Sequence, residues 1–269
     1  MSSSAENSQT EIFTANVSAK DAPHAGSACA AKPKAYLIDG SGYIFRAFYA
    51  VAPLTNKQGL PTNALFGFTR MLIKLLAMPD AQHVAMVFDA GRETFRNQLY
   101  PQYKANRDAP PEELVPQFPF FREIASTMGL PVLELPGYEA DDVIGTLTKR
   151  LASNGIETVV VTADKDLMQL VGGPVTLWDT MRDRRTGVAE VREKFGVDPD
   201  KVVEVLGLIG DDSDNIPGVA GVGPKTAAQL IERYGSVEAV LNSVENIRAD
   251  SSLRNRSKIA DQLLANPEI

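Results

Sequence analysis

Short apolar segments separated by stretches of helical character are the feature that most restricts how this chain can fold. Such alternation is typical of an α/β fold with a mainly parallel sheet flanked by helices. Four of the segments run into acidic residues that can share a site. The expected strands lie in "AYLIDGSG", "HVAMVFDAG", "PVLELPGYEADD", "IETVVVTADKD" and "VTLWDT".

Acidic residues follow these strands in a way that indicates a shared site. The carboxyl ends of parallel strands lie along one edge of the sheet, where ligands bind. Acids in a first helical turn are favoured by about 0.3–1 kcal/mol each, but this explains only the cluster that begins at Glu139. The others would repel one another, so the sequence predicts a cation site. Its seven carboxylates are Asp39, Asp89, Glu139, Asp141, Asp142, Asp164 and Asp166.

Composition narrows the identity of that cation. The single cysteine, Cys29, excludes disulfides within the chain and a cysteine-rich zinc site. Of the two histidines, His24 lies in the expected tail, so a triad or a histidine-rich site would have to use His83. Carboxylates favour Mg²⁺ or Mn²⁺. Two such ions, about 3.5–4 Å apart, can promote phosphodiester hydrolysis with a metal-bound water and no histidine base.

A second acidic motif precedes a glycine-rich segment in "GLIGDDSDNIPGVAGVGPKTAAQLIERYG", residues 207–235. Its acids would add to the same site. Glycines and a helix N-terminus allow backbone N–H groups to approach a phosphate, so a clamp on the DNA backbone is favoured over a plain turn between helices. The residues concerned are Asp211, Asp214, Gly218, Gly221, Gly223 and Lys225.

Basic and aromatic side chains alternate in "RETFRNQLYPQYKANR", residues 92–107, directly after Asp89. This mixture suits a nucleic-acid strand, through phosphate charge and base stacking. The alternative is a solvated helix face with buried aromatics. The side chains are Arg92, Phe95, Arg96, Tyr100, Tyr103, Lys104 and Arg107.

The net charge of −7 argues weakly against a nucleic-acid partner. Without the nine acids assigned to the site, however, the remainder would carry +2. The DNA-contacting surfaces can therefore be locally basic. No apolar run reaches 18 residues, so no membrane span is expected. Residues 1–34 have no hydrophobic periodicity and no apolar signal-peptide core, and they are expected to form a disordered tail.

Several ordered motifs give the chain a family resemblance. "LIDGSGYIFRAF", "VFDAG", "YKANR", "GYEADDVIGTL", "TADKDLMQLV" and "GDDSDNIPGVAGVGPKTA" resemble the 5′ nuclease domain of bacterial DNA polymerase I, in the flap endonuclease superfamily. The resemblance covers about residues 35–269. It implies a PIN-like core over 35–195 with a helical arch over about 92–125, and a three-turn helix–hairpin–helix DNA-binding region over 196–269.

The resemblance also implies roles for individual residues. Lys104 and Arg107 match arch residues that contact the scissile phosphate. Tyr103, Arg96 and Arg46 match further substrate contacts, and the hairpin at 216–226 resembles one that binds K⁺ and grips the phosphate backbone. Two metal sites are implied, with Asp39, Asp89, Glu139, Asp141 and Asp142 in the first and Asp164, Asp166, Asp211 and Asp214 in the second.

The implied function is cleavage of 5′ flaps and nicked duplexes, with 5′→3′ exonuclease activity, in DNA replication and repair. We expect a cytoplasmic bacterial monomer, associated with the nucleoid through DNA. The polymerase region that would follow is absent after "LLANPEI", which fits either a fragment or a stand-alone nuclease. Pro116 and Pro119 fall where an arch helix would run, so its start is expected near Phe120.

Three other functions compete with this one. A PIN-type ribonuclease shares the acidic core but does not account for the long hairpin or "YKANR". A non-catalytic DNA-binding module should lack acids at some metal positions, and all nine are present. A phosphatase of the HAD type should carry a second Asp after its nucleophile, which "DGSG" lacks.

Overall fold

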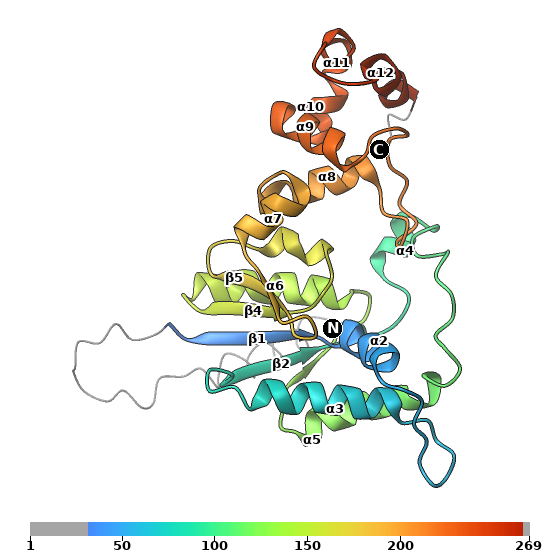
Figure 1. Cartoon of the computed structure of the whole chain (residues 1–269), viewed down its shortest axis with the longest axis vertical. Helices are drawn as coiled ribbons and strands as arrows, with labels where there is room; N and C mark the ends of the chain where they lie inside the picture. The colour runs from blue at the N-terminus through green and yellow to red at the C-terminus, as the bar shows by residue number, and fades with distance from the viewer. Residues whose placement is uncertain (1–31, 266–269) are drawn as a thin grey trace, which may run out of the picture.

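The computed structural model describes residues 32–265, and the expected tail over 1–34 lies almost wholly outside the described residues. One six-stranded sheet, in the order β3-β2-β1-β4-β5-β6, forms the base of the molecule (Figure 1). Every strand pair is parallel except that of the edge strand β6 with β5. The strands are β1 (Lys34–Asp39), β2 (His83–Val87), β3 (Val132–Leu133), β4 (Glu157–Val161), β5 (Val175–Asp179) and β6 (Arg184–Thr186).

The two faces of the sheet are covered by different helices (Figure 1). Alternate side chains of a strand point to opposite faces, and in β1 Leu37 packs into one apolar cluster while Tyr36 and Ile38 pack into another. Both faces are buried, which explains why the strands are continuously apolar. Helix α6 (Ala140–Ser153) covers the Leu37 face, and the other is covered by α2 (Gly40–Ala50), α3 (Asn63–Leu76) and α5 (Phe118–Thr127).

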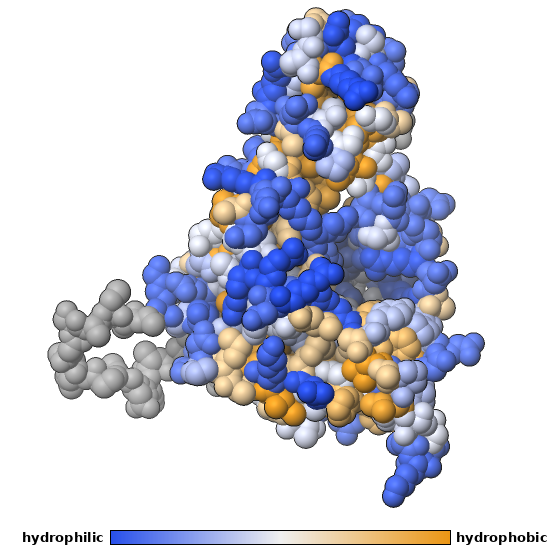
Figure 2. Space-filling view, viewed as in Figure 1, coloured by the Kyte–Doolittle hydropathy of each residue, from blue (hydrophilic) through white to orange (hydrophobic). Residues whose placement is uncertain are grey.

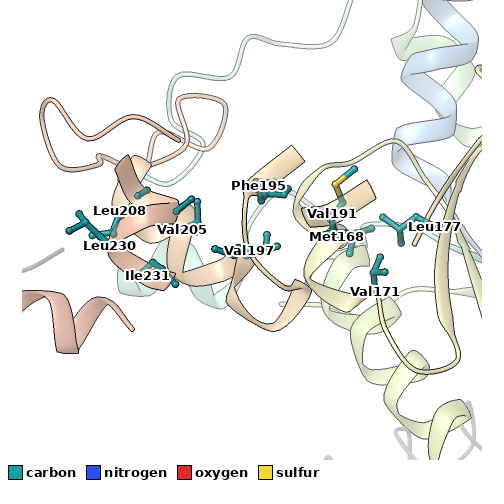
Figure 3. Close-up of a cluster of buried hydrophobic side chains, with 14 of the residues drawn as sticks. Met168, Val171, Leu177, Val191, Phe195, Val197, Val205, Leu208, Leu230 and Ile231 are labelled. Atoms are coloured by element: carbon teal, nitrogen blue, oxygen red, sulfur yellow. The ribbon is translucent and has the colours of Figure 1, made fainter. Parts of the chain in front are cut away.

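A column of helices rises from the sheet (Figure 1). One apolar cluster continues from the sheet into this column: Leu177 and Met168 lie at its base, Leu230 and Ile231 lie farther along it (Figure 3), and Ile259 and Leu263 continue it. The column is therefore packed onto the sheet through a shared core. Its helices are α7 (Val188–Phe195), η3 (Pro199–Lys201), α8 (Val202–Ile209), α9 (Pro224–Tyr234), α10 (Val237–Leu241), α11 (Val244–Ala249) and α12 (Arg256–Ala265), and η2 (Asp166–Leu170) lies at its foot.

The arch segment, residues 92–125, is helical only towards its ends. It begins with α4 (Phe95–Leu99), continues as turns and irregular chain, and re-enters helix at η1 (Val115–Gln117) and α5. Prolines interrupt the middle, because Pro lacks the N–H that a helix interior needs. The expected start near Phe120 is wrong by two residues: α5 begins at Phe118, and Pro119 lies in its first turn, where proline is tolerated.

No helix within residues 32–265 is long and apolar enough to cross a membrane.

Candidate active site

The predicted acids lie where the strands end. Asp39 is the last residue of β1 and is buried, with its oxygens accepting hydrogen bonds from the Gly42 N–H and the Thr162 hydroxyl, both at 2.9 Å. Asp89 lies just after β2 and accepts the Ala140 N–H at 2.8 Å, which ties it to the start of α6. The sheet edge and the first turn of α6 therefore form one acidic surface.

Burial and mutual repulsion raise the pKa values of two of these acids. Burial, followed by the charges of Asp39, Asp164 and Asp89, raises the pKa of Asp141 to about 8. Burial is also the main reason that the pKa of Asp39 rises to about 6, although hydrogen bonds from Gly42 and Thr162 oppose it. These carboxylates therefore face one another closely enough to oppose each other's ionisation.

A second group of acids adjoins the first. Burial raises the pKa of Asp166 to about 6, and the charges of Asp164, Asp211 and Asp214 add to this effect. Asp211 behaves differently: Lys165 lies 2.8 Å from its Oδ2, and hydrogen bonds from Lys165 and Ser213 outweigh burial and lower its pKa to about 2. The structure thus brings together the acids of both predicted metal sites.

Basic residues of the arch segment reach into this acidic surface. The Lys104 ammonium lies 2.7 Å from Glu139 and 3.9 Å from Asp214, and Arg107 lies 2.6 Å from Asp214. The Tyr103 hydroxyl lies 3.0 Å from a carboxylate oxygen of each of the same two acids. The three predicted substrate contacts therefore meet the predicted metal ligands directly.

The arch segment is also fastened to the loop that follows α8. The Lys104 N–H donates to the Asp214 carbonyl at 2.9 Å, and the Asn106 amide donates to the Asp212 carbonyl at 2.6 Å. In return, the Asn215 amide donates to the Gln102 carbonyl at 2.7 Å. Sequence reasoning missed this contact because the two segments lie more than a hundred residues apart, and Asn106 and Asn215 gave no signal.

Two predicted substrate contacts are held by carboxylates instead of pointing freely outward. Arg96 makes two hydrogen bonds to Asp142, at 2.7 and 2.8 Å, while Asp142 also accepts the Glu139 N–H. Asp142 is therefore occupied in shaping the start of α6. Arg46 makes two hydrogen bonds to Asp179, at 2.8 and 2.9 Å. The position of Asp179 at the end of β5, within "VTLWDT", was the signal that could have suggested this partner.

The carboxylate oxygens of these residues suit a divalent metal, although they are not arranged as a complete coordination shell. Among residues 32–265, no three acidic, histidine or cysteine side chains are gathered into a ready metal site. Lys104, Arg107 and Lys165 instead supply the positive charge. Asp166 Oδ1 is buried without a hydrogen-bond partner, so this oxygen is free to coordinate a cation. Carboxylate oxygens are the donors that Mg²⁺ and Mn²⁺ prefer.

The predicted hairpin joins α8 to α9, and its glycines have distinct roles. A Cβ on Gly218 would lie 2.2 Å from the Ile209 carbonyl, so this glycine permits a close backbone crossing. Gly221 has a φ of +85°, which favours glycine. Gly223 precedes α9 and has open space around it. A cleft of about 440 Å³ lies beside it, lined also by Lys165, Asp211 and Pro224, while Lys225 is exposed.

Figure 2 shows the surface hollowed between the helical column and the arch segment, with hydrophilic residues around the hollow. This architecture agrees with sequence families over the whole described chain. The 5′-3′ exonuclease N-terminal resolvase-like domain matches residues 34–196, and the 5′-3′ exonuclease C-terminal SAM fold matches residues 197–268. The chain belongs to the 5′-3′ exonuclease family.

The relatives that are similar to this chain are of two kinds, long polymerases and a shorter exonuclease. DNA polymerase I of Rhizobium leguminosarum is 47% identical over 223 residues, which are 79% of this chain and 22% of that protein. The 5′-3′ exonuclease of Aquifex aeolicus is 43% identical over 215 residues, covering 80% of this chain and 74% of that protein. The chain therefore spans about a quarter of the polymerases that it matches and most of the shorter exonuclease.

Solved structures share the fold. The bacteriophage T5 flap endonuclease, in a complex with DNA and metal ions, superposes with a TM-score of 0.69 at 23% identity, covering 87% of this chain and 85% of that one. The catalytic core of Rad2 with a DNA substrate gives a TM-score of 0.58 at 19% identity, covering 88% of this chain and 74% of that one. At these identities the likeness concerns the fold, which confirms the predicted parallel α/β core.

Proposed function

We propose that this chain is a structure-selective 5′ nuclease that hydrolyses phosphodiester bonds of DNA at 5′ flaps and nicks, with two divalent metal ions. One observation carries the proposal: acids that follow four strands lie close to one another, and basic residues of the arch segment contact two acids of this site, Glu139 and Asp214. Family membership and relatives named as polymerases and exonucleases support it. A role in bacterial DNA replication and repair, at the cytoplasmic nucleoid, is the corresponding proposal.

The chain divides into two parts by role. Residues 35–195 form the catalytic core, and residues 196–269 form the DNA-binding region. One ion would be held by Asp39, Asp89, Glu139 and Asp141, and the other by Asp164, Asp166, Asp211 and Asp214. Asp142, which pairs with Arg96, would lie outside these two sets of ligands. Mg²⁺ or Mn²⁺ bound there would supply an activated water and would stabilise the charge on the leaving oxygen.

The residues of the chain bind and orient the substrate. Lys104 and Arg107 already contact carboxylates of the site, at 2.7 and 2.6 Å, so they are within reach of a phosphate that approaches those acids. Positive charge placed there stabilises the charge that builds on the phosphate in the transition state. Tyr103 is buried at the site and holds Glu139 and Asp214 in place through its hydroxyl.

The hairpin between α8 and α9 would bind the backbone of the duplex. Backbone N–H groups at Gly221, Gly223 and Lys225 can approach a phosphate without reading a base. We propose that K⁺ bound by main-chain oxygens of this turn assists the contact. Replacing K⁺ with Li⁺ at constant ionic strength should then weaken duplex binding, and equal affinity in both salts would remove K⁺ from the proposal.

Cleavage of an end-labelled 5′-flap duplex in Mg²⁺ tests the function. Single-stranded DNA, blunt duplex and a matched RNA flap serve as the alternative substrates. We expect cleavage near the flap junction, little on the controls, and none in EDTA or with Asp141→Ala, which should still bind the flap within a few-fold. Preference for the RNA flap would favour a PIN-type ribonuclease, and binding without any cleavage would favour a non-catalytic module.

A further inference from the structure

Besides the arch segment and the hairpin between α8 and α9, a third basic surface lies at the edge of the sheet opposite the arch segment. Near the start of the arch segment, Thr94 bridges to Gly137, just after β3. The β5–β6 hairpin lies at the opposite edge of the same sheet, beyond β4. Three basic side chains gather there, which we call the β6 basic surface: Arg182 in the turn, Arg184 on β6 and Lys194 on α7, which packs against β6.

Asp179 holds this hairpin in a fixed shape. It is buried, and its Oδ1 accepts the backbone N–H groups of Met181 and Arg182 at 3.1 and 3.3 Å. It lies opposite Arg184 in the strand pairing, and its two oxygens also bind Arg46. One carboxylate therefore joins the turn that carries the basic residues to α2, whose Arg46 is a proposed substrate contact.

The basic side chains of the β6 basic surface, Arg182, Arg184 and Lys194, have no ion-pair partner among the described residues. Two acids of the same segment accept hydrogen bonds from neutral groups: Asp183 accepts the Trp178 indole N–H at 3.1 Å, and Glu190 accepts the Gly187 N–H at 2.7 Å. The surface is therefore available to an anion from outside the chain.

The basic residues also lie close enough to affect one another and the active site. Desolvation is the largest reason that the pKa of Lys194 is lowered, and the charges of Arg184 and Lys165 lower it further. Asp166 and Asp164 act in the opposite direction, so Lys194 lies near the second group of acids. The β6 basic surface therefore lies beside the acidic edge of the sheet, on the side opposite the arch segment.

We propose that the β6 basic surface binds the phosphate backbone of duplex DNA while the arch segment holds the single-stranded part on the other side of the site. The proposal rests on the proposed nuclease function. Figure 2 shows a strongly hydrophilic area across the middle of the face that carries β5 and α7. Arginine and lysine side chains bind phosphates by charge and do not select bases.

The contrast between the two sides explains why we assign the duplex here. The arch side exposes aromatic rings that can stack on unpaired bases, including Tyr100 and Tyr138. At the β5–β6 hairpin the aromatic ring, Trp178, is buried and covered by the Arg185 guanidinium at 4.1 Å. A surface of charge alone suits the regular backbone of a duplex, whose bases are already stacked and paired.

The salt dependence of duplex binding measures these contacts directly. The logarithm of the association constant falls with the logarithm of salt concentration by about 0.9 for each phosphate neutralised in duplex DNA. We would measure binding of a blunt duplex, in Ca²⁺ without cleavage, for the parent and for the double variant Arg182→Gln with Arg184→Gln. The slope should become shallower by about two units, and binding of single-stranded DNA should change far less.

Two controls separate this contact from net charge and from folding. Lys74→Gln with Lys149→Gln removes the same charge from exposed positions on α3 and α6 and should leave the slope nearly as in the parent. Arg182→Lys with Arg184→Lys keeps the charge and should keep the slope. An unchanged slope in the Gln pair would overturn the proposal, as would an equal loss in the Lys pair or in the control pair. Failure of the parent to bind or cleave any DNA would instead refute the nuclease function.

Discussion

At the scale of single residues, Lys104 is the clearest link between the arch segment and the acids. Its ammonium contacts Glu139 and its backbone N–H binds the Asp214 carbonyl. Its φ of 55° is in the left-handed region, which is uncommon for a residue other than glycine. The backbone conformation is therefore sustained by surrounding contacts, which fix where the side chain begins.

We predict that Lys104→Ala slows the chemical step more than it weakens binding. An interaction that strengthens in the transition state affects the rate of chemistry, and removal of one such donor costs about 10²–10³ in rate. Single-turnover cleavage at saturating enzyme should show this loss at two Mg²⁺ concentrations, and Lys104→Arg should recover part of it. A defect that disappears at high enzyme or high Mg²⁺ would make Lys104 a surface phosphate contact.

A second residue-scale prediction concerns pH. The folded chain raises the pKa of Asp39 and Asp166 to about 6 and of Asp141 to about 8, above the ordinary value of 3.8. The folded state then binds more protons than the unfolded state, so the free energy of unfolding should fall as pH rises from about 4 to about 8. Asp211 acts in a lower pH range. Its pKa is lowered to about 2 in the folded state, so its contribution to stability is present above about pH 4 and is lost as the pH falls towards about 2.

Urea unfolding in EDTA across this pH range measures the effect. Asp141→Asn removes the group with the highest of these values and should flatten the decline, particularly between about pH 6 and pH 8. A metal-free stability that increases steadily with pH would contradict the arrangement of facing carboxylates.

At the scale of elements, the hairpin between α8 and α9 can be tested without damaging the fold. A Cβ on Gly223 meets no atom within 4 Å and its φ is −94°, so Gly223→Val should fold normally. The valine should nevertheless keep a phosphate away from the start of α9. We therefore expect weaker duplex binding for all sequences, with the cleavage position unchanged, measured by titration of two unrelated duplexes.

Gly218 provides the matched control for that variant. Its Cβ would collide with the Ile209 carbonyl, so Gly218→Val should lower the melting temperature, whereas Gly223→Val should not. If Gly223→Val binds duplex DNA as tightly as the parent, the hairpin is only a structural turn.

The elements also show what the sequence could and could not predict. Continuous apolar runs predicted the strands, and as expected Asp39 ends β1 while Asp89 and Asp164 follow β2 and β4, since strand ends are local features. The edge strand β6 was not predicted, because "RRT" has no apolar pattern. The pairs Arg96–Asp142 and Arg46–Asp179 were also missed: each joins elements distant in sequence, and charge alone does not specify a partner.

At the scale of the whole molecule, the acidic edge should make stability depend on divalent ions. A ligand that binds only the folded state adds about 2.7 kcal/mol at one hundred times its dissociation constant. Thermal melts should therefore show a higher melting temperature in Mg²⁺ than in EDTA. The double variant Asp141→Asn with Asp166→Asn should lose most of this difference, and identical melts of the parent in both buffers would count against the site.

The central claim is that the facing carboxylates hold two divalent ions, and direct titration with Mn²⁺ tests it most directly. Electron paramagnetic resonance of free Mn²⁺ counts the ions bound per chain without requiring catalysis. We predict two ions for the parent, with one site lost or strongly weakened in Asp141→Asn and the other in Asp166→Asn. Binding of fewer than one ion per chain, or the same isotherm in all three proteins, would contradict the account.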